Sequence, residues 1–170
     1  MASLMEELLE VLGEEESRYQ TLAKLGEEKR QAIVKADIAA LDAVTVKEQD
    51  VSSELLNISH RRTSVLKDIA TVLGKDPGEL TLTKLIGYLD KQPVEQERLR
   101  EQRDRLLKTG GKMQSLNQQN EELLQRALEM VEFDLTLLRS MKQVPETANY
   151  DRSANNTGDL LGTSGFDAKQ

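Results

Sequence analysis

The sequence predicts an all-α protein: an antiparallel bundle of long amphipathic helices, two long, one short connector and one very long, followed by a disordered C-terminal tail. Aromatic residues make up only 3% of the 170 residues and there is no Trp. A core without aromatics is common in helix bundles and rare in β-sandwiches. Charged residues make up 31% and apolar residues 38%, a balance typical of long solvated helix faces. Apolar residues also recur at steps of three and four along most of the chain, which is the helical period.

The first helix is predicted over residues 3–35. Ser3 followed by Glu6 three residues later predicts a capping box at its start. Gly13 and Gly26 lie within it, and a glycine on a helix seam indicates close approach of a neighbouring helix more often than a break. Its apolar residues form one seam: Leu4, Leu8, Leu12, Tyr19, Leu22 and Ile33.

A second helix is predicted over residues 38–73. Asp37 is a good N-cap, Gly74 supplies a left-handed C-terminal residue, and Pro77 prevents continuation. A tight turn at Ala36-Asp37 is favoured over one continuous helix, because a lone amphipathic helix of that length would bury nothing. The seam of this helix contains Ile38, Leu41, Val44, Val51, Leu55, Ile58, Val65, Ile69 and Val72.

A short helix over residues 80–91 is predicted to close one end of the bundle. Thr81 is its expected N-cap, and Leu80 is placed to pack on Leu85. Its expected apolar face consists of Leu82, Leu85, Ile86 and Leu89.

The last helix is predicted to begin at Pro93 and to reach Lys142. Gly110-Gly111 lies inside it and leaves open whether the helix runs through, kinks or folds back. At 1.5 Å per residue the first two helices are each about 50 Å long and the last is roughly 75 Å. The end of the last helix should therefore project with its apolar seam uncovered. That seam contains Leu99, Leu106, Met113, Leu116, Leu123, Leu124, Ala127, Val131, Leu135 and Leu138.

The composition changes after residue 143. Pro, Asn and Gly punctuate a polar segment that has no helical period. We therefore expect a helical bundle domain over residues 1–143 and a flexible polar tail over residues 144–170.

Charge and composition exclude several classes of function. A net charge of −7 without a basic stripe argues against nucleic acid and anionic lipid as partners. The absence of Cys, of a secretory signal pattern and of any membrane-spanning apolar run predicts a cytoplasmic location. The di-iron sites of helix bundles use a Glu-x-x-His motif. The only histidine, His60, has Asn57 three residues before it, so this motif is absent. We expect no catalysis, no metal and no cofactor.

The predicted functional feature is a protein-binding surface on the last helix. Anchors at three and four spacing are typical of a helix that packs against a partner. Self-association is an equal alternative from the residues alone, in which case the chain is a coiled-coil scaffold without a transient client. Asn120 falls on or near the seam, where it either fixes helix register or is a solvated surface residue. The candidate anchors are Leu124, Leu128, Val131, Leu135 and Leu138.

Two segments resemble the FlgN family of flagellar type III export chaperones. One runs from Ala39-Ala40-Leu41 through Val46-Lys47-Glu48 to Arg61-Arg62. The other is Leu116-Asn117-Gln118-Gln119-Asn120-Glu121-Glu122-Leu123-Leu124, an Asn-x-x-Asn step leading into a Leu-rich final helix. The resemblance covers roughly residues 1–150, including the order of long and short helices.

The resemblance implies a cytoplasmic chaperone that binds flagellar hook–filament junction proteins by their amphipathic C-terminal helical ends. The client-binding part of the family corresponds to about residues 123–141 of this chain. A Tyr just past the final helix is implicated in docking to the export gate, and Tyr150 occupies that position. The tail beyond Tyr150 has no counterpart in the family pattern.

Overall fold

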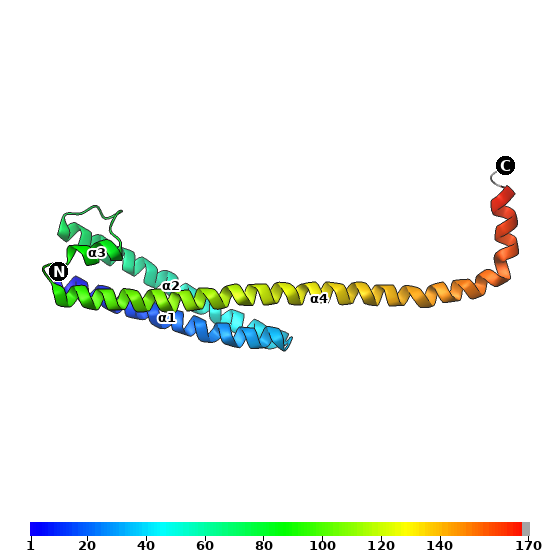
Figure 1. The fold of residues 1–170 in the computed structure, drawn as a ribbon, viewed down its shortest axis with the longest axis horizontal. Helices are drawn as coiled ribbons and strands as arrows, with labels where there is room; N and C mark the ends of the chain where they lie inside the picture. The colour runs from blue at the N-terminus through cyan, green and yellow to red at the C-terminus, as the bar shows by residue number, and fades with distance from the viewer. Residues whose placement is uncertain (168–170) are drawn as a thin grey trace. The chain divides into compact units, whose positions relative to one another are not determined.

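The computed structural model describes the backbone of residues 1–167 and the side chains of residues 1–142. Within the described backbone there are four helices and no strand, which confirms the all-α prediction: α1 (Ala2–Val34), α2 (Ile38–Leu73), α3 (Leu82–Tyr88) and α4 (Pro93–Asp167) (Figure 1). The backbone of α4 extends to Asp167, past the predicted helix end at Lys142. The side chains of the predicted polar tail, residues 144–170, lie outside the described residues, so its polar, flexible character stays a prediction.

The chain divides into two units, Met1–Leu124 and Gln125–Gln170. We call them the bundle unit and the C-terminal unit. The bundle unit contains α1, α2, α3 and the first part of α4, and the C-terminal unit contains the rest of α4.

The predicted turn between the first two helices is confirmed, and its hydrogen bonds explain how it closes. The N–H of Asp37 donates to the carbonyl of Ala32 (2.9 Å) and the N–H of Ala36 donates to that of Ile33 (3.1 Å). This is the Schellman pattern, with Ala36 in the left-handed region at φ 53°. Asp37 then begins α2, since its carboxylate accepts from the N–H of Ala40 (3.0 Å).

The start of the first helix differs from the prediction. α1 begins at Ala2, its N-cap is Met1, and no side chain caps it. Ser3 is therefore already inside the first turn, so the predicted capping box with Glu6 is wrong. The carboxylate of Glu6 pairs instead with Arg98 on α4 (Nη1–Oε1 2.5 Å). A tertiary partner replaces the local one.

The predicted ends of α2 and the start of α3 are confirmed. Gly74 adopts φ 63° at the end of α2, and the Thr81 hydroxyl accepts from the N–H of Lys84 (3.2 Å) at the start of α3. α3 ends at Tyr88 rather than near Lys91. Leu80 and Leu85 belong to the same buried cluster, as expected for two residues that pack on each other.

The main core lies where α3 meets the three long helices, so the short helix does close one end of the bundle. The buried members come from α1, α2, the segment around α3, and α4: Met5, Leu8, Leu12, Val65, Ile69, Ala70, Leu80, Leu85, Ile86, Leu89, Leu99 and Leu106. A smaller cluster of Leu22, Leu25 and Val44 lies nearer the α1–α2 turn. Ile38 (73% exposed) and Val72 (58%), both predicted for the α2 seam, face solvent. Next to Val72, it is Leu73 that packs against the main core.

Polar contacts give the directions of the long helices in the bundle unit. Glu14–Arg61 and Lys29–Glu48 pair α1 with α2 in opposite directions (N···O 2.7 and 3.0 Å). In the contacts between α1 and α4, the residue numbers of both helices increase together, from Glu6–Arg98 to Gly26–Asn120. These two helices are therefore parallel. The bundle is therefore up-down-up, and α2 is antiparallel to both neighbours (Figure 1).

α4 begins at Pro93, as predicted, and runs through Gly110-Gly111 without interruption. Of the alternatives that this glycine pair left open, folding back is thereby excluded. A Cβ built on Gly110 would lie 3.7 Å from Cε2 of Tyr19, and one on Gly111 would meet no atom within 4 Å. Among the residues described, no helix combines the length and apolarity needed to cross a membrane.

Candidate protein-binding surface

The predicted anchors on α4 are exposed in the C-terminal unit. Leu128, Val131, Leu135 and Leu138 are between 48% and 56% exposed. At 100° per residue they fall within about 80° of one another around the helix, so they share one face. We call these four residues the anchor row. Leu124, the fifth predicted anchor, is half-buried and belongs to the bundle unit.

A second exposed apolar row was missed by the sequence reasoning. It contains Met130, Phe133, Leu137 and Met141, which are between 49% and 68% exposed. Their spacing of three, four and four was visible in the sequence, but it lies about 140° round the helix from the anchor row. We call this set the Met/Phe row. The two rows together occupy about 160° of the helix circumference.

The polar side of this segment spans about 100° of the helix, between the two apolar rows. Glu129, Glu132, Thr136, Arg139 and Ser140 share it by helical spacing. The hydroxyls of Thr136 and Ser140 donate to backbone carbonyls one turn earlier, at 2.9 and 3.1 Å. No ion pair forms among the described side chains of residues 125–142. The exposed apolar rows are therefore the feature of this segment that points to a protein partner.

Within the bundle unit, one buried polar contact joins α1 and α4. The side chain of Asn120 is 3% exposed and its Nδ2 donates to the carbonyl of Gly26 (2.7 Å). The Oδ1 atom of the same amide is buried without a partner. A Cβ on Gly26 would lie 3.6 Å from Leu116 Cβ, so this glycine does mark a close approach. Asn120 is therefore buried, which excludes the solvated alternative, and its role in fixing helix register stays a prediction. Gly13 marks no such approach, since nothing lies within 4 Å of its Cβ position.

A second polar cluster lies where α1, α2 and α4 meet. The buried carboxylate of Glu15 accepts two hydrogen bonds from Nη1 of Arg62 (2.7 and 2.8 Å). The Tyr19 hydroxyl donates to the same carboxylate (3.3 Å). Burial, and then the negative charge of Glu15, raise the pKa of Tyr19 above its ordinary value. These residues line an open groove between α2 and α4 together with Gly110, Gly111 and Met113.

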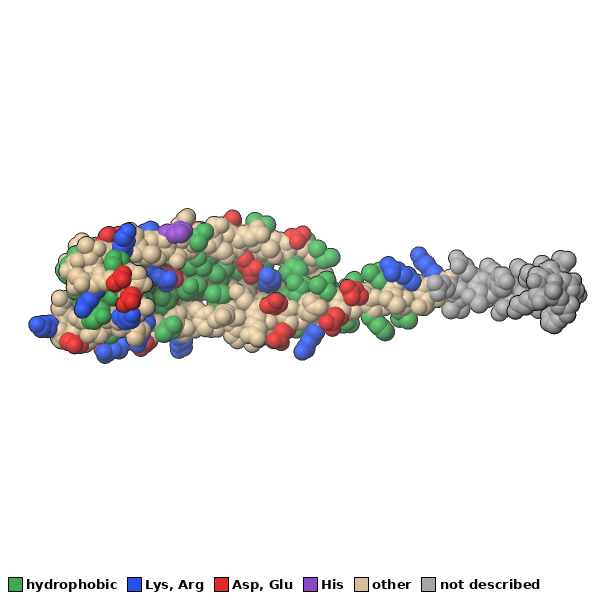
Figure 2. Space-filling view, turned by 90° about the horizontal axis from the view of Figure 1, so that it is seen from above, with side chains coloured by type: hydrophobic (Ala, Val, Ile, Leu, Met, Phe, Trp, Pro, Cys, Tyr) green, Lys and Arg blue, Asp and Glu red, His purple; other side chains and the backbone are tan. Residues whose placement is uncertain are grey.

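On the face shown in Figure 2, hydrophobic side chains gather in a band along the bundle unit, with charged side chains on either side. Tyr19, Val51, Leu55 and Met113 are partly buried residues packed against the smaller core cluster. The bundle therefore leaves part of its apolar interior accessible where α3 no longer covers it.

Candidate catalytic features do not come together. His60 is exposed on α2. In the part of the chain whose side chains are described, no three His, Asp or Glu residues gather closely enough to hold a metal ion. Tyr150, the predicted docking residue for the export gate, lies outside the residues whose side chains the structure describes.

Comparison with known proteins gives one match. The FlgN protein family model matches residues 1–158, which extends the resemblance noted for residues 1–150. No curated protein and no solved structure matches the chain significantly. Because the family model spans most of the 170 residues, and because four helices in the expected order and an exposed apolar stretch of α4 accompany it, this chain belongs to the FlgN family of flagellar export chaperones.

Proposed function

We propose that this protein is a cytoplasmic type III export chaperone that binds flagellar hook–filament junction proteins and delivers them to the export apparatus. The observation that supports it is the anchor row, Leu128, Val131, Leu135 and Leu138, which is exposed on α4 of a chain in a chaperone family. A client that presents an amphipathic helical end would bury this row as a helix-to-helix contact. Leu124 extends the row at the bundle end.

The anchor row supplies part of the free energy of client binding. Each fully buried Leu or Val contributes roughly 1.5–3 kcal/mol. Loss of free motion and the ordering of side chains offset much of that sum. The sum for the four residues is roughly 6–12 kcal/mol before these losses. It is therefore only part of the about 8 kcal/mol net that micromolar affinity needs, and other contacts with the client supply the rest.

The decisive experiment separates binding from folding. Leu135→Ala/Leu138→Ala should weaken binding of a purified junction protein at least tenfold, as measured by calorimetry. The melting temperature should stay nearly unchanged, because both side chains are about half exposed in the free chain. Deleting the C-terminal helical segment of the client should abolish binding to the unaltered chaperone.

Two control variants make the result interpretable. Val46→Ala/Leu56→Ala removes two exposed apolar side chains from α2 in the bundle unit and should change neither binding nor melting. Ile58→Ala, at a side chain only 5% exposed, should lower the melting temperature markedly. If the Leu135/Leu138 variant melts as badly as Ile58→Ala, those leucines are core residues and the proposed surface is wrong.

The alternative is a structural coiled-coil scaffold, in which a second copy covers the anchor row. A scaffold would dimerise through this row and would be indifferent to deletion of the client's terminal segment. Delivery through Tyr150 is a separate part of the proposal. Its test is Tyr150→Ala, which should leave client binding intact and reduce export.

A further inference from the structure

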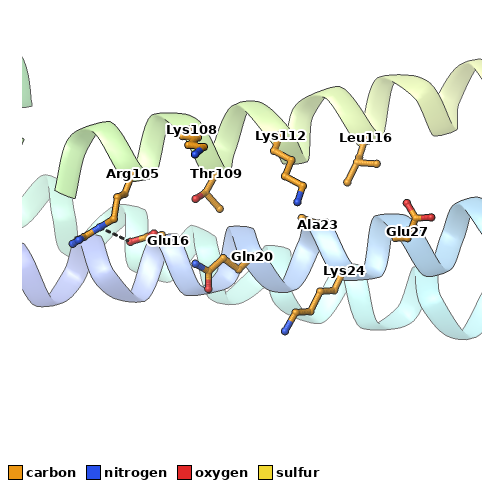
Figure 3. A pocket seen from close by; sticks show the side chains of 10 residues that line it. All are labelled: Glu16, Gln20, Ala23, Lys24, Glu27, Arg105, Lys108, Thr109, Lys112 and Leu116. Carbon is orange, nitrogen blue, oxygen red and sulfur yellow. Dashed lines mark ion pairs between the residues drawn. The ribbon is translucent and has the colours of Figure 1, made fainter. Parts of the chain in front are cut away.

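A groove between α1 and α4 in the bundle unit is separate from the anchor row. It has a volume of about 640 Å³ and runs along the two parallel helices for about three turns of each, or roughly 17 Å. Figure 3 shows Lys112 and Leu116 extending from α4 towards α1, with Lys24 on the outer side of α1. The residues that line it are Glu16, Gln20, Ala23, Lys24, Glu27, Arg105, Lys108, Thr109, Lys112 and Leu116.

The groove is positively charged in a chain that is acidic as a whole. Four of its lining side chains are cations and two are carboxylates, whereas the chain carries 30 acidic and 23 basic residues. Arg105 lies 3.7 Å from the carboxylate of Glu16. Lys24, Lys108 and Lys112 form no ion pair with any described residue.

The arrangement of these cations is unfavourable in the free protein. Arg105, Lys108 and Lys112 stand at three and four spacing on one face of α4, and like charges at this spacing repel one another. Carboxylates from outside the chain would relieve that repulsion. The positive row is spread over about 10 Å of helix, so one small anion cannot neutralise it.

The floor of the groove is small and partly apolar. Ala23 on α1, Thr109 on α4 and Leu116 on α4 are half-buried residues of its lining. The aliphatic stems of the lysines add apolar area beside their charged ends. Two parallel helices with small residues between them form a groove into which a third helix can pack.

We infer that this groove binds an acidic amphipathic helix of a partner protein. The helix carries a narrow stripe of Ala and Leu between two rows of Asp or Glu and covers about three turns. Charge complementarity selects it, and the net charge of −7 disfavours a long polyanion such as nucleic acid. The site shares no residue with the anchor row.

The test uses the full chain and two synthetic peptides. Both are labelled 16-residue peptides with capped ends and the same Ala/Leu stripe, one flanked by Glu and the other by Lys. Fluorescence anisotropy should detect binding of the Glu peptide, weakening as salt is raised. Lys108→Glu/Lys112→Glu should weaken that binding at least tenfold and should create binding of the Lys peptide.

Matched variants assign the effect to the groove. Lys67→Glu/Lys84→Glu makes the same change in net charge at exposed lysines elsewhere in the bundle unit and should leave binding of the Glu peptide within twofold. Leu135→Ala/Leu138→Ala should also leave it unchanged, so this inference and the proposed function can fail separately.

Four outcomes would overturn the inference: no binding of the Glu peptide, equal binding of both peptides, an equal loss in the Lys67/Lys84 variant, or full competition by a DNA duplex of the same net charge. The last outcome would show a general polyanion site.

Discussion

At the residue scale, Asn120 and Ala36 each have a feature that depends on residue type: a buried hydrogen bond for Asn120 and a left-handed backbone for Ala36. Asn120 places a buried amide between α1 and α4 and satisfies only its donor, because its Oδ1 has no partner. An apolar residue would avoid that cost but would not recognise the carbonyl of Gly26. A buried polar residue that specifies register at the expense of stability is known from coiled coils. We expect it to specify how α4 lies along α1.

Ala36 adopts a left-handed conformation that favours glycine. At φ 53° its Cβ is crowded by the backbone, at a cost of about 1–2 kcal/mol. Ala36→Gly should therefore raise the free energy of unfolding by about 0.5–1 kcal/mol, after the greater chain entropy of glycine is taken into account. Urea denaturation followed by circular dichroism measures this.

The matched control is Ala43→Gly, at an exposed position inside α2. There a glycine should cost about 1 kcal/mol. Equal destabilisation by both variants would show that Ala36 is not left-handed in solution.

At the scale of the element, α4 contains two adjacent glycines, Gly110 and Gly111, and no neighbouring atom requires either position to lack a side chain. A Cβ on Gly110 would meet Tyr19 at ordinary contact distance, and one on Gly111 would meet nothing. Gly110→Ala/Gly111→Ala should therefore stabilise the chain by about 0.5–1 kcal/mol for each substitution. The unfolding free energy measures the gain.

Gly74→Ala serves as the opposite case, because φ 63° penalises any side chain there. It should lower the unfolding free energy by about 1 kcal/mol. If the Gly110/Gly111 variant is destabilised instead, the helix bends at this pair in solution.

At the scale of the whole molecule, stability should be uneven. Helices in water are stabilised mainly by packing of their apolar faces. The bundle unit buries its faces in two core clusters, whereas the anchor and Met/Phe rows of the C-terminal unit are exposed. Amide hydrogen exchange should therefore be fast over residues 128–141 in the dilute free protein and slow in the complex with a junction protein.

Slow exchange over residues 128–141 in the free protein at all dilutions would contradict this expectation. Slow exchange that appears only at high concentration would indicate that a second copy covers the exposed rows. Exchange at Leu8, Ile69 and Leu99 supplies the internal standard, since these side chains are fully buried.

The order of the helices and several of their ends could be predicted from the sequence because these signals are local. Asp37, Thr81, Pro93 and Gly74 act within one turn of their own positions, so boundaries could be read from them. Apolar residues at steps of three and four predicted most of the core residues, because this spacing is also a local property of each helix. The exposed anchor row followed from spacing as well, although its role as a binding surface remains a proposal.

Which side chains pair, are buried or line a groove depends on how the helices pack in the tertiary structure. Ser3 is not the N-cap because α1 begins at Ala2, two residues earlier than predicted, and the carboxylate of Glu6 pairs with Arg98 on α4. The burial of Asn120, and the gathering of Lys24, Lys108 and Lys112 in one groove, depend on α1 and α4 being parallel and in one register. Residues about 90 positions apart contribute to these sites, and spacing along a single helix carries no information about which helix packs beside it.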